Sequence, residues 1–206
     1  MKAEIDLTME QKIMHAAERL FLEKGFAMTS TGEIAKEAGC NQTLVHYYFR
    51  TKDRLFETIF QTKISVFITD FLQIGEANIS FEEKLRRKIE AHFDMLDSNR
   101  QLPFLFLNEL ITNPARIASV KENFGALPAK AYRQFRKELA VEIGKGSIRD
   151  IAPLDIVLSV FALNIVVFLM HPVLKEVIGM DEPAFRELAD RRKKENVAMV
   201  LASLRP

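Results

Sequence analysis

Two short helical patterns separated by a very short turn constrain the fold of this chain more than any other feature. Both patterns lie within residues 29–52, and only Ala38-Gly39-Cys40 stands between them. Ser30 and Glu33 have the spacing of a capping box, in which each side chain satisfies a free backbone N–H at the start of a helix. Gly39 can supply the left-handed residue that ends this helix, and Asn41 can cap the next one. The segment therefore predicts a helix-turn-helix.

The second predicted helix presents a polar and aromatic front. Helical spacing places Gln42, Thr43 and His46 on one face. The apolar residues of both helices are left to pack inward, and these are Ile34, Ala35, Ala38, Val45 and Phe49. A polar face of this kind has no packing purpose, which indicates that the helix reads DNA in the major groove. The alternative is a helix pair that only packs and reads nothing.

The pattern around this segment resembles the N-terminal domain of the TetR family of bacterial transcriptional regulators. The resemblance runs from Gln11 to Phe60 and rests on Ala16-Ala17, Leu20-Phe21, Gly25-Phe26, Thr29-Ser30, Ile34-Ala35, Ala38-Gly39, Tyr47-Tyr48-Phe49, Lys52 and Leu55. It implies that Gln42, Thr43 and His46 face bases and that Thr29, Tyr47, Tyr48 and Lys52 contact the DNA backbone. Gln42 could bind adenine through its paired donor and acceptor.

Three positions depart from the family pattern. Tyr48 stands where a histidine is usual, His46 where a tyrosine is usual, and Leu44 where a small or polar residue is common. Leu44 could contact a thymine methyl group or pack against the neighbouring helix.

Composition fits an ordinary globular protein. The chain has 206 residues and a formal net charge of +1, so any attraction to phosphate must come from the placement of individual lysines and arginines. Cys40 is the single cysteine, which excludes an intramolecular disulfide and fits the cytoplasm. The mixed charges of Met1–Gln11 do not form a signal peptide.

Almost the whole chain reads as helix, without the sustained alternation of a strand. We expect an all-α protein with an N-terminal three-helix helix-turn-helix domain at residues 1–60 and a helical effector-binding and dimerisation domain at residues 61–206. The predicted boundaries in the second part are a cap at Ser80, a helix bracketed by Pro103 and Pro114, an interruption at Pro128 within Arg116–Ile143, and a last helix from Pro183.

Leu154–Met170 is the most apolar stretch of the chain. A helix that is apolar on nearly all sides must be covered on nearly all sides. Its length is at the short limit for crossing a membrane, so burial against a second subunit is the better interpretation. The family resemblance implies that the last two long helices form the interface of a homodimer, and we expect Val160, Ile165, Val197 and Leu201 to lie there.

Catalytic and metal-binding patterns are missing from the sequence. His15, His46, His92 and His171 are scattered, and Gly144-Lys145-Gly146-Ser147 lacks the spacing of a phosphate loop. We therefore expect no enzyme, no cofactor and no metal. The Phe-rich inner faces could be core or could line an apolar ligand cavity, with polar anchors among them; the candidates are Phe67, Phe71, His92, Phe93, Phe104, Phe135, Phe161 and Asn164.

These patterns together predict a cytoplasmic homodimer that binds a palindromic double-stranded operator and regulates transcription as a repressor released by a small apolar ligand. A regulator of the same fold that responds to a protein partner or to no ligand is one alternative. A membrane-associated helical interaction protein that inserts Leu154–Met170 is the other. The operator, the inducer, the regulated genes and the choice between repression and activation are not encoded in any of these patterns.

Overall fold

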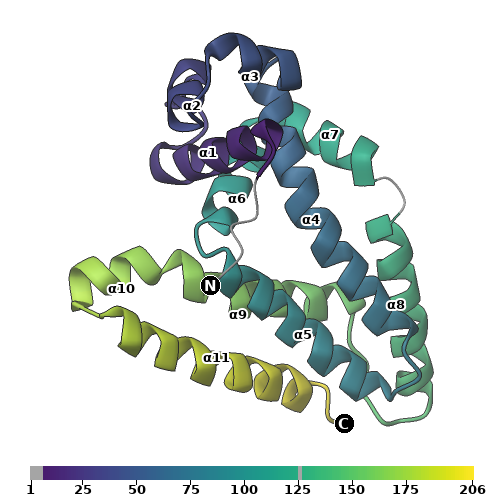
Figure 1. Ribbon diagram of the computed structural model, residues 1–206. Helices are drawn as coiled ribbons and strands as arrows, with labels where there is room; N and C mark the ends of the chain where they lie inside the picture. Colours follow the sequence, from purple (N-terminus) through teal and green to yellow (C-terminus); the bar gives the residue numbers. More distant parts are fainter. Residues whose placement is uncertain (1–6, 125–126) are drawn as a thin grey trace, which may run out of the picture. The chain divides into compact units, whose positions relative to one another are not determined.

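The computed structural model describes residues 7–124 and 127–206. Within helices it gives the backbone but not the side chains of Ile64, Val66, Phe67, Ile68, Asp70, Phe71, Glu76, Val120, Asn123 and Phe124. The described residues form helices joined by turns, with no strand among them, so the prediction of an all-α fold is confirmed (Figure 1). The helices are α1 (Met9–Lys24), α2 (Thr31–Glu37), α3 (Gln42–Phe49), α4 (Lys52–Glu76), α5 (Phe81–Ser98), α6 (Leu102–Thr112), α7 (Pro114–Phe124), α8 (Leu127–Gly144), α9 (Pro153–Leu169), α10 (His171–Ile178) and α11 (Glu182–Ser203).

Local capping sets where the first helices begin. The hydroxyl of Ser30 accepts a hydrogen bond from the backbone N–H of Glu33 at 3.2 Å, and the Glu33 carboxylate accepts one from the N–H of Ser30 at 2.9 Å. Lys24 donates to the same carboxylate at 2.7 Å, and this bond together with those from Ser30 lowers the pKa of Glu33 to about 2. The Asn41 side chain caps α3, and Gly39 has a φ of +71° between the two helices. The predicted helix-turn-helix is therefore present.

Two helix boundaries differ from the sequence prediction. Pro128 lies in the first turn of α8, where a missing N–H is tolerated, so it does not interrupt a helix. The predicted long segment Arg116–Ile143 is instead divided between α7 and α8. The second difference is α10, which no pattern in the sequence analysis identified. It ends at Gly179, a glycine in the left-handed conformation.

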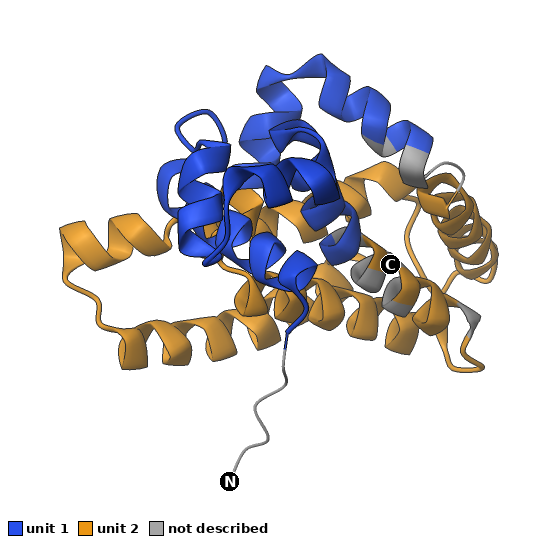
Figure 2. Ribbon diagram, turned by 45° about the horizontal axis from the view of Figure 1, so that its top comes forward, with its two compact units in different colours: residues 1–64, 105–123 blue, residues 65–104, 124–206 orange. Residues whose placement is uncertain are grey.

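The chain divides into two compact units, coloured separately in Figure 2. Unit 1 contains residues 1–64 and 105–123, so α7 and most of α6 are grouped with the N-terminal helices. An aromatic cluster explains this grouping: the ring of Phe106 in α6 lies 4.4 Å from that of Phe60 and 6.1 Å from that of Phe56, both in α4. Unit 2 contains residues 65–104 and 124–206.

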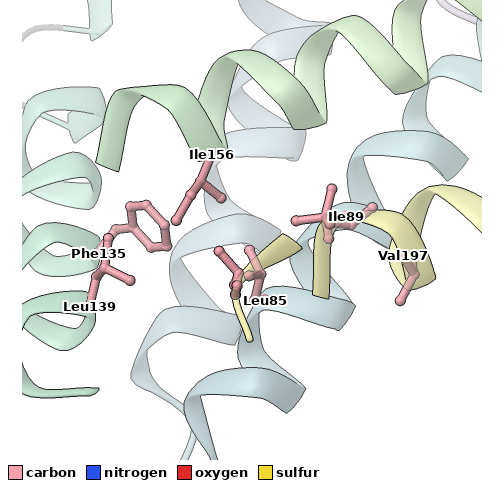
Figure 3. Packing of buried hydrophobic residues seen from close by; sticks show 8 residues of the cluster. Leu85, Ile89, Phe135, Leu139, Ile156 and Val197 are labelled. Carbon is pink, nitrogen blue, oxygen red and sulfur yellow. The ribbon is translucent and has the colours of Figure 1, made fainter. Parts of the chain in front are cut away.

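The core of unit 2 lies where α5, α8, α9 and α11 meet. One cluster joins Leu85 and Ile89 of α5 to Ile156 of α9 and Val197 of α11, with Phe135 of α8 beside Ile156 (Figure 3). A second cluster is built on the buried rings of Phe93, Phe168 and Phe185. Because four helices each bury an apolar face here, unit 2 has a hydrophobic core of its own.

Candidate nucleic-acid interface and effector cavity

The reading helix α3 has one buried face and one exposed face. Val45 and Phe49 are 2% and 5% exposed and hold α3 against the rest of unit 1. Gln42, Thr43 and His46 are all exposed, as is expected of side chains that would enter a DNA groove. The burial of the apolar residues fixes the rotation of α3 about its axis, so the polar front is presented to solvent as a unit.

Hydrogen bonds orient two side chains of this front before any DNA is bound. The Gln42 amide donates to the hydroxyl of Thr31 at 2.8 Å and lies 3.5 Å from Nε2 of His46. Nδ1 of His46 lies 3.0 Å from the carbonyl oxygen of Arg50, and a carbonyl only accepts, so Nδ1 carries the proton. In the neutral ring Nε2 is then the acceptor, which suits the Gln42 amide. Gln42 and His46 therefore present hydrogen-bond donors and acceptors in a defined arrangement on the exposed face of α3.

Tyr47 and Tyr48 follow the predicted base-facing residues on the exposed side of α3. Their side chains are 68% and 39% exposed, and the two rings meet edge to face at 5.3 Å. Exposed phenol groups at this position can donate to phosphate oxygens. Leu44 is partly buried, which favours the packing alternative for this residue over contact with a thymine methyl group.

The side chain of Thr29, a residue predicted to contact the DNA backbone, is buried. It is 2% exposed, and its hydroxyl donates to the carbonyl oxygens of Gly25 at 2.9 Å and Leu20 at 3.2 Å. The hydroxyl therefore closes the end of α1 and is turned away from solvent. The hydroxyl of Thr29 is therefore not available to a phosphate, and a contact of Thr29 with the DNA backbone through its main chain stays a prediction.

Lys52 also has an internal role that the sequence did not indicate. Its ammonium donates to the carbonyl oxygens of Phe26 and Thr29, both at 2.9 Å, and lies 4.3 Å from the centre of the Phe26 ring. Two of the three N–H donors of this lysine are thus used inside unit 1. A phosphate contact by Lys52 stays a prediction and would use the remaining donor.

A buried arginine connects α7 to α4 in the same unit. Arg116 is 5% exposed, and its guanidinium lies 2.8 Å from Asp53, 3.5 Å from Glu57 and 3.6 Å from Glu109. The guanidinium carbon lies 4.7 Å from the centre of the Phe26 ring and 4.6 Å from that of Phe56. The charge of Arg116 is compensated by carboxylates from two helices, α4 and α6. No pattern in the sequence indicated that Arg116 would be buried.

Unit 2 contains an apolar cavity between α5, α8 and α9. Its empty volume is about 420 Å³, and part of this space is open to solvent. The lining comes from three helices and consists of Leu85, Lys88, Ile89, His92, Phe135, Ile156, Val157, Val160 and Phe161. Three of the predicted ligand-binding residues, His92, Phe135 and Phe161, are therefore brought together at one place.

Other predicted ligand-binding residues lie elsewhere. Phe93 is packed inside the cluster with Phe168 and Phe185, and Phe104 is 69% exposed. Asn164 is fully buried and does not line the cavity, because its amide donates to the carbonyl of Ile89 at 3.0 Å and its oxygen accepts from Asn196 at 2.9 Å. Phe93, Phe104 and Asn164 therefore do not line this cavity, and their part in ligand binding stays a prediction. The side chains of Phe67 and Phe71 lie outside the described residues.

Lys88 and His92 are the polar residues of the cavity lining, one turn apart on α5. Burial lowers the pKa of Lys88 and lowers that of His92 to about 4. His92 is therefore neutral at neutral pH, and its Nδ1 lies 3.2 Å from the Asn164 amide nitrogen, which donates to it. Sequence reasoning missed Lys88, although its spacing from Leu85 and His92 places it on the inner face of α5.

The residues predicted for the dimer interface pack against the core of unit 2, and their place in an interface stays a prediction. Val197 is 2% exposed, and Val160, Ile165 and Leu201 are partly buried against the two core clusters. They lie on the inner faces of α9 and α11 because those helices contact each other and α5. The exposed apolar side chains of α9 are Leu154, Leu158, Phe161 and Val166, and all of them are between 45% and 57% exposed.

Among the described residues, no single helix is both long and apolar enough to cross a membrane. The bent pair α9 and α10 passes by length and composition together, with an angle of 41° between its parts. No group of histidine, cysteine and acidic side chains within residues 7–124 and 127–206 has the arrangement of a metal site.

Comparison with known proteins places the helix-turn-helix in a family. Residues 13–59 match the family described as bacterial regulatory proteins, tetR family. The uncharacterized HTH-type transcriptional regulator YerO of Bacillus subtilis (strain 168) is 28% identical over 149 residues, which cover 71% of this chain and 51% of YerO. The fatty acid metabolism regulator protein of the same organism is 27% identical over 99 residues, covering 48% of this chain and 51% of that protein.

The similarity of fold extends over nearly the whole chain. The structure of the fatty acid degradation regulator FadR from Bacillus halodurans matches with a TM-score of 0.64 at 20% identity, covering 94% of this chain and 97% of that chain. At this identity the match shows the fold alone. The chain spans about half the length of the curated relatives that it matches. Residues 13–59 are therefore similar in sequence to the tetR family of bacterial regulatory proteins, and the chain as a whole shares its fold with solved members of that family.

Proposed function

We propose that this chain is a sequence-specific DNA-binding transcriptional regulator of the cytoplasm. The observation that carries the proposal is the orientation of α3, whose apolar face is buried while Gln42, Thr43 and His46 are exposed together. A helix-turn-helix reads base edges with such a face, while exposed donors around it hold phosphates. The family match at residues 13–59 and the regulators among its relatives support this function.

Selection of bound fragments from random double-stranded DNA tests this proposal. The wild type should enrich a palindrome whose half-sites are one helical turn apart, because a two-fold dimer presents two equivalent reading helices. Gln42→Ala should relax the preference at one position in each half-site, whereas Lys36→Ala on the exposed surface of α2 should leave the enriched sequence unchanged. Failure of the wild type to enrich any sequence above the starting pool would contradict the proposal.

The palindrome requires a homodimer, and we infer that α9 contributes the interface. Leu154, Leu158 and Phe161 are exposed on one face of this helix, at intervals of four and three residues. A continuous apolar face is costly to leave in water on a monomer. We infer that a second copy of the chain covers this face, since an isologous contact buries the same face of both subunits.

Sedimentation velocity tests the interface. The wild type should sediment as a dimer at micromolar concentration, and Leu158→Glu should shift it to a monomer. Val141→Glu is the matched control, because Val141 on α8 is also apolar and is 55% exposed. A monomeric wild type, or equal effects of the two substitutions, would contradict the assignment of the dimer interface to α9.

We further propose that occupation of the cavity lined by His92, Phe135 and Phe161 releases the protein from its operator. If a bound ligand weakens operator binding, the bound operator must weaken ligand binding by the same free energy, about 1–3 kcal/mol. A thermal-shift screen, followed by operator titration with and without each hit, measures this coupling. Hits that bind unit 2 without changing operator affinity would favour a regulator that responds to a protein partner or to no ligand.

A further inference from the structure

Arg116 of α7 contacts the turn between α1 and α2, which leads into the helix-turn-helix. Its guanidinium carbon lies 4.7 Å from the centre of the Phe26 ring, and Phe26 belongs to this turn. The Phe56 ring of α4 lies close to both groups, with its centre 4.6 Å from the guanidinium carbon and 5.1 Å from the centre of the Phe26 ring. These three residues all belong to unit 1. A side chain of α7 therefore packs directly on the segment that precedes α2.

The polar partners of Arg116 do not account fully for its position. Two of its nitrogens pair with Asp53 at 2.8 Å and with Glu57 at 3.5 Å. Its Nε is buried and has no hydrogen-bond partner among the described residues, since the Glu109 carboxylate oxygen lies 3.6 Å away. Buried polar atoms usually have a partner, so a guanidinium placed only to compensate carboxylates should satisfy this atom too. The contacts with the two aromatic rings supply a second reason for the observed placement.

A series of contacts runs from Phe26 to the base-facing side of α3. The carbonyl oxygens of Phe26 and Thr29 both accept a hydrogen bond of 2.9 Å from the ammonium of Lys52, which ties the two ends of the turn together. Thr31, the first residue of α2, follows two positions after Thr29. Its hydroxyl accepts a hydrogen bond of 2.8 Å from the amide of Gln42. A displacement of the turn therefore changes where the Gln42 amide is held.

We propose that Arg116 is a positioning residue for DNA reading: it holds Phe26 and the turn before α2 and, through Thr31, sets the place of Gln42. Arg116 is 5% exposed, so it acts through these contacts and not through a bond of its own to DNA. The inference rests on the proposed function in taking Gln42 as a base-facing residue; the hold on the turn is independent of DNA.

Titration of two duplexes tests the effect on reading. The duplexes are the selected operator and the same operator with the base pair assigned to Gln42 exchanged in each half-site. Arg116→Lys keeps the charge but loses the planar guanidinium, and Phe26→Leu removes the ring. Both variants should reduce the ratio of the two affinities by about threefold or more. A loss of stability alone weakens binding to both duplexes alike and leaves this ratio unchanged. A wild-type ratio in both variants would overturn the proposal.

Two controls match these substitutions in unit 2. Arg86→Lys changes an arginine that pairs with acidic residues of its own helix, α5. Phe81→Leu changes a phenylalanine that stacks on another ring of unit 2, at 5.9 Å between the ring centres. Both controls should keep the wild-type ratio, and a reduction equal to that of Arg116→Lys and Phe26→Leu would contradict a specific role of the turn.

The double variant of Arg116→Lys and Gln42→Ala shows whether the two residues act together. Once the Gln42 amide is gone, Arg116→Lys should reduce the ratio no further, because the effects of coupled residues are not additive. Such a cycle is the direct evidence that a series of contacts transmits an effect. A full additional reduction in the double variant would show that Arg116 acts by another route and would contradict the assignment.

Amide hydrogen exchange of the free protein separates this inference from the proposed function. Residues 26–37 should exchange faster in Arg116→Lys and Phe26→Leu than in the wild type, because the turn and the start of α2 lose part of their hold. This result in a protein that binds no operator would support the hold of Arg116 on the turn and contradict the regulator. Operator binding with unchanged exchange and an unchanged affinity ratio in both variants would support the regulator and overturn the role of Arg116.

Discussion

The ammonium of Lys52 donates a hydrogen bond of 2.9 Å to the carbonyl oxygen of Thr29. The same group donates to Phe26 at 2.9 Å, so one side chain at the start of α4 satisfies two carbonyls of the segment between α1 and α2. That segment immediately precedes the helix-turn-helix. Lys52 therefore holds the entry to α2 in place, in addition to any contact with DNA.

Lys52→Met should lower the free energy of unfolding by about 1–3 kcal/mol, because two carbonyls lose a charged donor. Urea denaturation followed by circular dichroism measures this change, with Lys36→Met as the exposed control. If Lys52 also contacts a phosphate, Lys52→Met should reduce the salt slope of DNA binding by about one. Unchanged stability in Lys52→Met would contradict the internal role.

Arg116→Met should be strongly destabilising. The substitution leaves Glu109, which is 8% exposed, and Glu57 without the guanidinium that compensates them. Removing one partner of a buried ion pair typically costs about 3–5 kcal/mol. Arg86→Met is the control, since the Arg86 side chain is 41% exposed in its pair with Glu82. Similar urea midpoints for the two variants would show that the carboxylates do not depend on Arg116.

His92 should make the stability of the protein depend on pH between about 6.5 and 4. Burial lowers its pKa from 6.5 to about 4, so in this interval the unfolded chain takes up a proton that the folded chain does not. The free energy of unfolding should therefore fall as the pH falls, by up to about 1.4 kcal/mol per pH unit. Above this interval both states are neutral at His92 and the dependence disappears.

Urea denaturation at a series of pH values checks this prediction. His92→Gln should remove most of the decline, because a glutamine oxygen can still accept from Asn164 but does not titrate. His15→Gln, a change at an exposed histidine of α1, should keep the decline. Parallel curves for wild type and His92→Gln would contradict a neutral, buried His92.

The beginnings of the N-terminal helices could be predicted because their determinants are local. Ser30 and Glu33 are close in sequence, and Gly39 and Asn41 act on their immediate neighbours. The burial of Thr29 could not be predicted, since its hydroxyl is held by the carbonyl of Leu20 across a turn. The internal bonds of Lys52 likewise depend on a segment far away in the sequence.

The lining of the apolar cavity in unit 2 was only partly predictable for the same physical reason. Helical spacing identifies an inner face but does not say whether a neighbouring helix fills it. Phe93 and Phe135 both lie on inner faces, yet one is packed in a core cluster and the other borders a cavity. Asn164 resembled a ligand anchor from its apolar surroundings, but its partners Ile89 and Asn196 come from two other helices.

The central claim, that the exposed face of α3 reads base edges, is tested most directly by fluorescence-anisotropy titration of one variant on two DNA duplexes. The duplexes are the selected operator and the same operator with one base pair of each half-site exchanged at the position assigned to Gln42. Gln42→Ala should lose about 1–3 kcal/mol on the operator and discriminate less between the duplexes, while Lys36→Ala should discriminate between them as the wild type does. If Gln42→Ala binds the operator as tightly as the wild type and discriminates equally well, α3 does not read DNA through this face.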